Sequence, residues 1–266
     1  MRKLLLATAL LTETCIPGSQ VGLPAMKRSL LLISLLLLVA GCSATGPASP
    51  GGPGSMPACF AGALPCADCE AIDYTLDLFA DRGYHLAMRY RGKGDAVFEQ
   101  AGKWEQSADG DVLTLQAREP MRFAIEGPDA LRLLDRSGAP IVSSLNYTLE
   151  RVPNAALAGT QWRLTHLGSM TTKVADDRGA HIVLDGAGRV AGSDGCNRIG
   201  GGYRLEGDQL AFSQLFSTRM ACAEGMEQAE RLGRALGVTA RHRIAGNHLE
   251  LLDAAGAVLA RFEAER

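Results

Sequence analysis

Apolar and polar side chains alternate through two neighbouring segments, residues 72–78 and 84–90, which are joined by Asp81-Arg82-Gly83. A β-strand points successive side chains to opposite faces, so a period of two gives each segment one dry and one wet face. The apolar members are Ile72, Tyr74, Leu76, Leu78, Tyr84, Leu86, Met88 and Tyr90. The pattern predicts an antiparallel β-hairpin.

More short strands are expected after this hairpin, separated by turn residues such as Asp109-Gly110-Asp111. The expected strands are 97–104, 112–116, 122–125, 131–134 and 147–152. So many antiparallel strands in so short a block leave exposed edges unless the sheet closes. We therefore predict a small, closed or nearly closed β-barrel domain over residues 59–152.

A second block begins after Pro153-Asn154 and changes its period part-way. Its expected strands are 181–184, 189–192, 203–205, 209–212, 248–252 and 258–262. Between them, apolar residues recur at helical spacing, which predicts an amphipathic helix over about 224–237 with Gly237 as its C-terminal stop. Residues 157–266 should therefore form an α+β domain.

The amino-terminal region carries an export signal. Met26-Lys27-Arg28 precedes an apolar run, residues 29–38, and Val39-Ala40-Gly41 leads into Cys42. The run is about half the length of a membrane-spanning helix, which favours a cleaved signal over an anchor. We expect Met26 to be the true start, residues 1–25 to be an annotation artefact, and residues 1–41 to be removed.

The Val-Ala-Gly-Cys sequence resembles a bacterial lipobox, which implies that Cys42 is the first mature residue and carries the lipid. Cleavage of an ordinary signal peptide near Cys42 is the alternative. Ser43, rather than aspartate, follows the cysteine, and by resemblance to lipoprotein sorting this implies the outer membrane with the protein facing the periplasm. Residues 42–58 are rich in Gly, Pro and Ser and predict a disordered lipid tether.

Charge and cysteine content narrow the possible partners. The chain has 27 basic and 29 acidic side chains without a basic tract, which makes nucleic acid an improbable partner. Besides Cys15 and Cys42, five cysteines remain: Cys59, Cys66, Cys69, Cys196 and Cys222. Disulfides persist in an exported protein, and an odd number leaves one thiol over.

Cys66-Ala67-Asp68-Cys69 is the sharpest local motif. Two thiols at this spacing either close a small disulfide ring or bind one soft metal ion. A structural zinc site would need two more ligands, whereas two thiolates suffice for Cu(I). Met56, Cys59, His85 and Met88 are further candidate ligands, although nothing in the sequence places them there.

The segment from Ala63 to Ile72, Ala-Leu-Pro-Cys-Ala-Asp-Cys-Glu-Ala-Ile, resembles the N-terminal domain of the NlpE copper-resistance lipoproteins. Gly102-Lys103-Trp104, residues 131–135 and residues 146–149 extend the likeness over about 60–152. The resemblance implies a lipocalin-like barrel, an outer-membrane anchor, and roles in copper tolerance and surface-stress signalling. The OB-like second domain of that family is not recognisable here.

The segments Gly192-Ser193-Asp194-Gly195-Cys196-Asn197-Arg198 and Thr218-Arg219-Met220-Ala221-Cys222 resemble the META domain of the heat-shock protein HslJ. Gly159-Thr160-Gln161-Trp162 and the expected helix belong to the same likeness, which implies an envelope-associated domain without established enzymatic activity. Within this domain we favour a Cys196–Cys222 disulfide, with Asn197 and Arg198 bracing the loop. A pair of buried free thiols is the alternative.

No pattern supports an enzyme. The histidines, His85, His166, His181, His242 and His248, are scattered and form no recognised catalytic or metal-binding motif. Arg241-His242-Arg243 resembles a solvated strand face, a paired-carboxylate site at Asp176-Asp177 lacks support, and Trp104 and Trp162 suit core anchors.

The sequence thus predicts a non-catalytic envelope lipoprotein, anchored to the membrane, with envelope proteins as possible partners. Copper is the one cofactor it suggests, through Cys66 and Cys69. The alternative is an envelope-integrity interaction module in which these cysteines form a structural disulfide.

Overall fold

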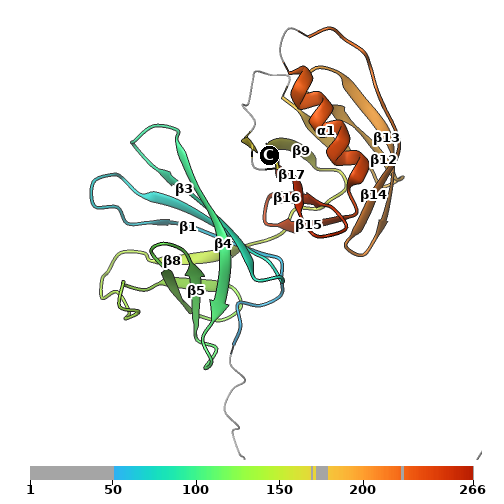
Figure 1. The fold of residues 1–266 in the computed structure, drawn as a ribbon. Coiled ribbons are helices and arrows are strands. Elements are labelled where there is room, and N and C mark those ends of the chain that lie inside the picture. Colours follow the sequence, from blue (N-terminus) through green and yellow to red (C-terminus); the bar gives the residue numbers. More distant parts are fainter. Residues whose placement is uncertain (1–50, 169, 172–178, 223–224, 266) are drawn as a thin grey trace, which may run out of the picture. The chain divides into compact units, whose positions relative to one another are not determined.

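The computed structural model describes residues 51–168, 170–171, 179–222 and 225–265 (Figure 1). The chain divides into two units, Met1–Gly46 and Pro47–Arg266, and both sheets of the protein belong to the second unit. The predicted signal region, the predicted lipidation residue Cys42, most of the predicted tether and the Asp176-Asp177 segment lie outside the described residues.

Eight antiparallel strands form a closed barrel in the order β1 to β8, in which β1 pairs with both β2 and β8. The strands are β1 (Ala58–Leu64), β2 (Ile72–Leu78), β3 (Gly83–Tyr90), β4 (Val97–Gln106), β5 (Val112–Gln116), β6 (Met121–Ile125), β7 (Ala130–Leu133) and β8 (Thr148–Val152). The inward side chains, including Phe60, Leu76, Leu86 and Phe123, are fully buried, as the alternating pattern requires. The predicted small antiparallel barrel is confirmed.

Two features of the barrel differ from expectation. Strand β1 was not among the predicted strands, because its Ala- and Gly-containing sequence alternates only weakly. The tether prediction is wrong for residues 51–57, because Arg151 on β8 donates hydrogen bonds to the carbonyl oxygens of Pro53 and Ser55 (3.3 Å for Ser55). Met56 also packs against the barrel core, so this stretch is ordered by contact with the barrel.

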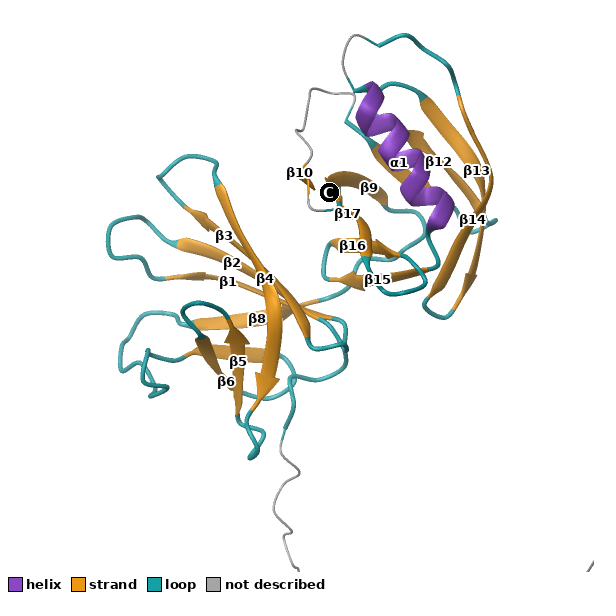
Figure 2. Cartoon of the chain, viewed as in Figure 1, coloured by secondary structure: helices purple, strands orange, loops and turns teal. Residues whose placement is uncertain are grey.

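The second sheet has nine strands in the order β10-β9-β11-β12-β13-β14-β15-β16-β17, and β9 also pairs with β17. The strands are β9 (Gln161–Leu167), β10 (Met170–Thr171), β11 (His181–Leu184), β12 (Arg189–Ser193), β13 (Arg198–Glu206), β14 (Gln209–Ser217), β15 (Arg241–Ala245), β16 (His248–Leu252) and β17 (Val258–Ala264). Helix α1 (Met226–Val238) lies beside this sheet (Figure 2). Its buried side chains, including Leu232 and Leu236, share a core with Trp162. The α+β character is confirmed.

The end of α1 corrects one prediction. Gly237 lies within the helix rather than stopping it. Thr239 caps the end instead: its hydroxyl donates to the carbonyl oxygen of Ala235 (2.8 Å) and its backbone N–H to that of Leu236 (3.3 Å). At many helix ends the terminal carbonyl groups accept hydrogen bonds from backbone N–H groups that follow a left-handed glycine. Here a side-chain hydroxyl takes part instead.

The barrel contacts the second sheet through a small buried cluster. Cys59, Phe79 and Ala245 are each at most 3% exposed, and Val152 packs against them. The backbone N–H of Gly246 donates to the side-chain oxygen of Asn154 (2.7 Å), and Ala155 N–H donates to the Gly246 carbonyl oxygen (2.8 Å). The connection between the sheets is therefore held by hydrogen bonds on both sides of Gly246.

Candidate functional site

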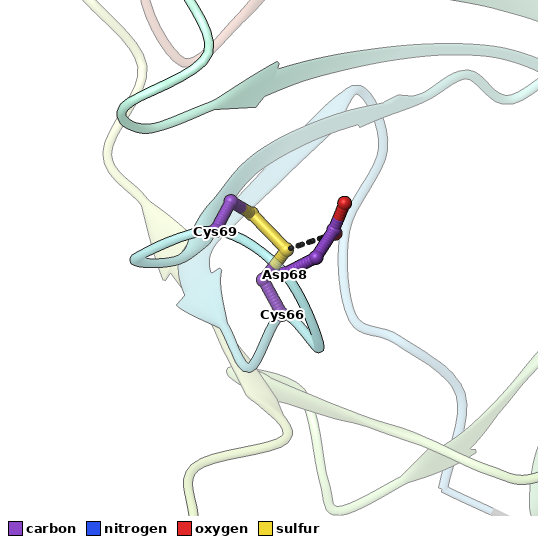
Figure 3. Close-up of side chains that lie close together, drawn as sticks. All are labelled: Cys66, Asp68 and Cys69. Carbon is purple, nitrogen blue, oxygen red and sulfur yellow. Dashed lines mark hydrogen bonds between the residues drawn. A yellow bond between two sulfur atoms is a disulfide. The ribbon is translucent and has the colours of Figure 1, made fainter.

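The turn that joins β1 to β2 holds Cys66 and Cys69 in a disulfide, with their Cα atoms 5.3 Å apart (Figure 3). Asp68 is exposed between them, and its Oδ1 lies 3.5 Å from Cys66 Sγ. Its other oxygen accepts a hydrogen bond from Lys93 Nζ at 3.1 Å. The turn thus presents two sulfurs and one carboxylate at the surface of the barrel.

This turn is a possible metal-binding group only in its reduced form. One ligand atom each from Cys66, Asp68 and Cys69 lies within 4.8 Å of the others. A metal ion needs deprotonated thiolates, and the sulfurs are instead bonded to each other. The oxidised turn therefore does not fit Cu(I), whereas the reduced turn would offer two soft donors side by side.

The structure rules out two of the extra ligands that the sequence left open. Cys59, Asp77 and His85 lie side by side across β1, β2 and β3. The turn leaves β1 at its other end, after Leu64, about 17 Å away at the usual rise of a strand. Cys59 and His85 can neither pair with nor complete the Cys66-Cys69 group.

Cys59 is the free cysteine among the described residues, and it is buried. Burial, followed by the negative charge of Asp77, raises the pKa of the Cys59 thiol far above its usual value. The thiol therefore stays protonated and unreactive, because the thiolate is the form that attacks or binds metal.

A buried ion pair lies beside Cys59. Asp77 is fully buried on β2, and its Oδ2 accepts a hydrogen bond from His248 Nδ1 on β16 (2.8 Å). Burial alone would raise the pKa of Asp77, but the charge and hydrogen bond of His248 lower it overall. Burial likewise opposes the charged form of His248, and Asp77 outweighs that effect to raise the pKa of His248.

Arg243 corrects the prediction of a solvated face on β15. Its guanidinium lies 3.4 Å from the ring centroid of Phe79 and pairs with Glu250 on one side and Asp81 on the other, at 2.6 and 3.2 Å. Only 18% of its side chain is exposed. The alternation in the sequence identified the strand, but the barrel covers the side that we expected to face water.

The second disulfide joins Cys196, between β12 and β13, to Cys222, shortly before α1. Asp194 accepts the backbone N–H groups of Cys196 (2.9 Å) and Asn197 (2.6 Å), and Asn197 Oδ1 accepts the N–H of Met220 (2.8 Å). Asn197 thus braces the loop. The chain-entropy relation assigns this bridge about 3–4 kcal/mol.

Both tryptophans are buried anchors. Trp104 is 4% exposed and donates its indole N–H to the carbonyl oxygen of Phe79 (3.2 Å). Trp162 is fully buried and donates to the carbonyl oxygen of Leu157 (2.9 Å). Each ring fills a core while its polar atom is satisfied, which leaves neither free to stack on a ligand.

Sequence reasoning missed one group of residues. His85, His166 and His248 line one polar cavity of about 670 Å³ together with Glu99. They come from β3, β9 and β16, and Glu99 comes from β4. No local motif could have revealed them, because they are about 80 residues apart and only the contact between the sheets brings them together.

Three segments of the chain match family models. Residues 26–43 match the prokaryotic membrane lipoprotein lipid attachment site, residues 60–144 the NlpE N-terminal domain, and residues 155–266 the META domain. The chain thus combines a lipoprotein attachment site with one segment similar to the NlpE N-terminal domain and one similar to the META domain. Both resemblances inferred from the sequence are confirmed, and the attachment site makes this a membrane-anchored envelope lipoprotein.

Lipoprotein NlpE of Escherichia coli K12 is 38% identical over 134 residues, which cover 47% of this chain and 56% of that protein. The match thus spans about half the length of that relative. A putative lipoprotein from Shewanella oneidensis aligns at 33% identity with a TM-score of 0.34, covering 37% of this chain and 90% of that one. The structure of the Cpx pathway activator NlpE from Escherichia coli aligns at 24% identity with a TM-score of 0.30, covering 64% and 100%.

Within the described residues, no helix combines the length and apolar character needed to span a bilayer. The matching family models name no catalytic activity.

Proposed function

We propose that this lipoprotein acts without catalysis in copper tolerance or the envelope stress response, anchored through Cys42 to the outer membrane and facing the periplasm. The observation that carries the proposal is the half-buried Cys66–Cys69 pair beside the exposed Asp68, in a segment that matches the NlpE N-terminal domain. Envelope proteins are its proposed partners, and nucleic acid is not among them.

Copper and oxidation compete for the same sulfurs in this proposal. The chain crosses the inner membrane with reduced thiols, and one Cu(I) then displaces two thiol protons to form a dithiolate complex. Oxidation instead gives the disulfide seen in the structure. Copper uptake thus depends on metal arriving before the turn is oxidised.

Cu(I) titration of the reduced full-length protein, against a chromophoric Cu(I) chelator, tests this step. We expect one Cu(I) per chain, lost in Cys66→Ser/Cys69→Ser and kept in the control Cys196→Ser/Cys222→Ser, because among the described residues only the first pair belongs to a cluster of ligand atoms, with Asp68. Equal affinity in both variants would refute copper binding at this turn.

The second candidate is an envelope-integrity interaction module in which Cys66–Cys69 is purely structural. The disulfide in the structure favours it. In that case the serine variants lose thermal stability while Cu(I) affinity stays weak and unchanged, so melting and titration on the same proteins separate the two candidates.

Anchoring and sorting have their own test. Cys42→Ala should lose the lipid label and leave the membrane fraction, and the wild-type protein should sediment with outer-membrane markers. A labelled, membrane-bound Cys42→Ala protein would contradict lipidation at Cys42.

A further inference from the structure

An apolar groove of about 750 Å³ lies between helix α1 and the end of strand β14, which Figure 1 shows beside each other. Ile199, Leu215 and Leu236 line it. Phe216 from the strand and Met226 from the helix line it as well, and these two side chains are 66% and 53% exposed. Large apolar side chains exposed on both walls of a groove are typical of an interaction site.

Strand β14 leaves a sheet edge open along this groove. Among the described strands, β14 pairs with β13 as far as Ser217, but with β15 at Gln209 alone, opposite Arg241. In an antiparallel ladder, alternate residues direct their N–H and C=O groups away from a given neighbour. Over residues 211–217 these groups therefore face a side on which no described strand lies, and an extended peptide is the partner that could pair with them.

Helix α1 keeps space free over the groove. Gly233 lies inside the helix and lines the groove. A Cβ added there would meet no atom of the described chain within 4 Å, so internal packing does not require glycine at this position. Glycine inside a helix is destabilising relative to alanine. The groove is therefore wider at Gly233 than the fold itself needs.

The charged residues that line the groove are all acidic: Asp194, Glu227 and Glu230. Asp194 is 4% exposed and accepts hydrogen bonds from backbone N–H groups of its own loop. The side chains of Glu227 and Glu230 are 72% and 69% exposed, and the arginines with which they pair line a separate cavity. The groove thus favours an occupant that carries basic groups, and its charge opposes an anionic lipid.

The end of the groove near the start of α1 is held in place. Cys196, in its disulfide with Cys222, has its Sγ 3.8 Å from Met226 Sδ. Gln228 on the helix donates a hydrogen bond to the carbonyl oxygen of Asp194 (3.2 Å). A groove with fixed walls loses little conformational entropy when it binds, which favours affinity.

We propose that this groove binds one extended peptide segment, which pairs with the open edge of β14 as an added strand. Its apolar side chains lie against α1, and a flanking lysine or arginine reaches Glu227 and Glu230. The helical wall from Met226 to Leu236 is about 15 Å long, which corresponds to about four or five extended residues. A natural occupant would be an unfolded or terminal segment of another envelope protein.

This site is independent of the proposed copper chemistry. Cys66 and Cys69 lie in the turn between β1 and β2, and neither lines the groove. Peptide binding and Cu(I) uptake can therefore fail separately.

Fluorescence anisotropy of a labelled heptapeptide tests the proposal on the full-length lipoprotein in phosphatidylcholine nanodiscs, with empty discs as the blank. The peptide has lysine at both ends, and between them three threonines alternate with two valines, so that lysines and valines share one face of a strand. We expect saturable binding of one peptide per chain. Glutamate in place of both lysines should weaken binding by about 3-fold or more, the scale of an exposed charge contact.

Gly233→Leu should fill the groove and weaken binding by at least about 10-fold, because the peptide can no longer bury an apolar side chain there. Its melting temperature should not fall, since leucine is the better helix former. Gly237→Leu is the matched control: Gly237 lies in the same helix, its added Cβ would also meet no atom of the described chain within 4 Å, and it does not line the groove. Gly237→Leu should keep full affinity.

Methylation of peptide nitrogens tests strand pairing itself. Successive N–H groups of a strand point to opposite sides, so an edge strand uses only alternate ones. Of two peptides, one N-methylated at the valines and one at the threonines between the lysines, only one should lose binding. Equal affinity of these two peptides would overturn strand addition. Absence of saturable binding, equal affinity in the two glycine variants, or equal affinity for the acidic and basic peptides would overturn the site and leave the copper proposal untouched.

Discussion

The two ends of the β-barrel carry cysteines in opposite environments. At one end the β1–β2 turn exposes Asp68 between two sulfurs, and at the other end Cys59 is 2% exposed beneath Ala245 and Gly246. The same strand, β1, leads from one to the other. The difference shows that burial, more than residue type, decides which thiols of this domain are available to metal or oxidant.

Overpacking the end of the barrel that contains Cys59 should lower its stability more than any of the changes below. A Cβ on Gly246 would lie 2.6 Å from Cys59 Cβ, and the residue has a φ of +56°. Gly246→Ala should lower the free energy of unfolding by about 3 kcal/mol, from overpacking and from left-handed backbone strain. Urea unfolding measures it.

Gly94→Ala, near the exposed end, is the control for Gly246→Ala. Gly94 has a φ of +92°, and a Cβ added there would meet no atom within 4 Å, so only backbone strain remains. Gly94→Ala should lower the free energy of unfolding by about 1 kcal/mol. Equal losses in the two variants would mean that the covered end is not tightly packed.

Acid should lower the free energy of unfolding, because folded His85 resists protonation. Its folded-state pKa is about 3, below the ordinary 6.5, so between those values the unfolded chain binds a proton that the folded chain refuses. Stability therefore falls as the pH falls, by about 2 kcal/mol from pH 6.5 to 4.5. Unfolding of His85→Gln over this range should show a smaller loss than wild type.

The contribution of His248 to stability depends on pH in the opposite direction. Asp77 raises its folded-state pKa, so its contribution is fully present below 6.5 and is lost as the pH rises through the raised value. His248→Gln should therefore lose its difference from wild type at alkaline pH. A His248→Gln difference that grows with rising pH would contradict the buried ion pair.

Removing the Cys66–Cys69 disulfide should lower stability by less than the changes above. Cys66 and Cys69 are three residues apart, and the chain-entropy relation gives so short a ring at most about 2 kcal/mol. Cys66→Ser/Cys69→Ser should lose less stability than Cys196→Ser/Cys222→Ser, whose bridge spans a separation of 26. Thermal melting compares them, and the reverse order would make the small ring the main structural bridge.

Rates of alkylation compare directly how accessible the cysteines are at the two ends of the barrel. In the native protein at pH 8, Cys59 should react with iodoacetamide at least about 100-fold more slowly than in urea, because its thiol is buried and protonated. After mild reduction, Cys66 and Cys69 should react at rates near those of unfolded peptide. Mass spectrometry follows each site, and rapid labelling of native Cys59 would show that the cover opens readily.

Strands with one face in a core were predictable because alternation is written into them, as in β2 and β3. Strand β1 was missed because Ala61, Gly62 and Ala63 give little contrast between its faces. The end of α1 was misplaced because Gly237 is compatible with a helix interior and the deciding contact is a hydroxyl at Thr239.

The cysteine motifs were visible because their residues are close in sequence or share a recognisable loop. The histidine cavity was invisible for the opposite reason. His85, Glu99 and His166 carry no local signal, and their proximity depends on how one sheet rests on the other. Burial of Asp77 was equally hidden, since β2 alone suggests a solvated face there.

The hydrogen bonds from Arg151 to the carbonyl oxygens of Pro53 and Ser55 have a mechanical consequence. A lipid anchor upstream applies any pulling force to the start of β1, which lies between β2 and β8. Force along β1 would load the hydrogen bonds to both neighbours in shear, so that many must break together rather than one at a time. The strand that carries the tether is thus the one that the barrel holds from both sides.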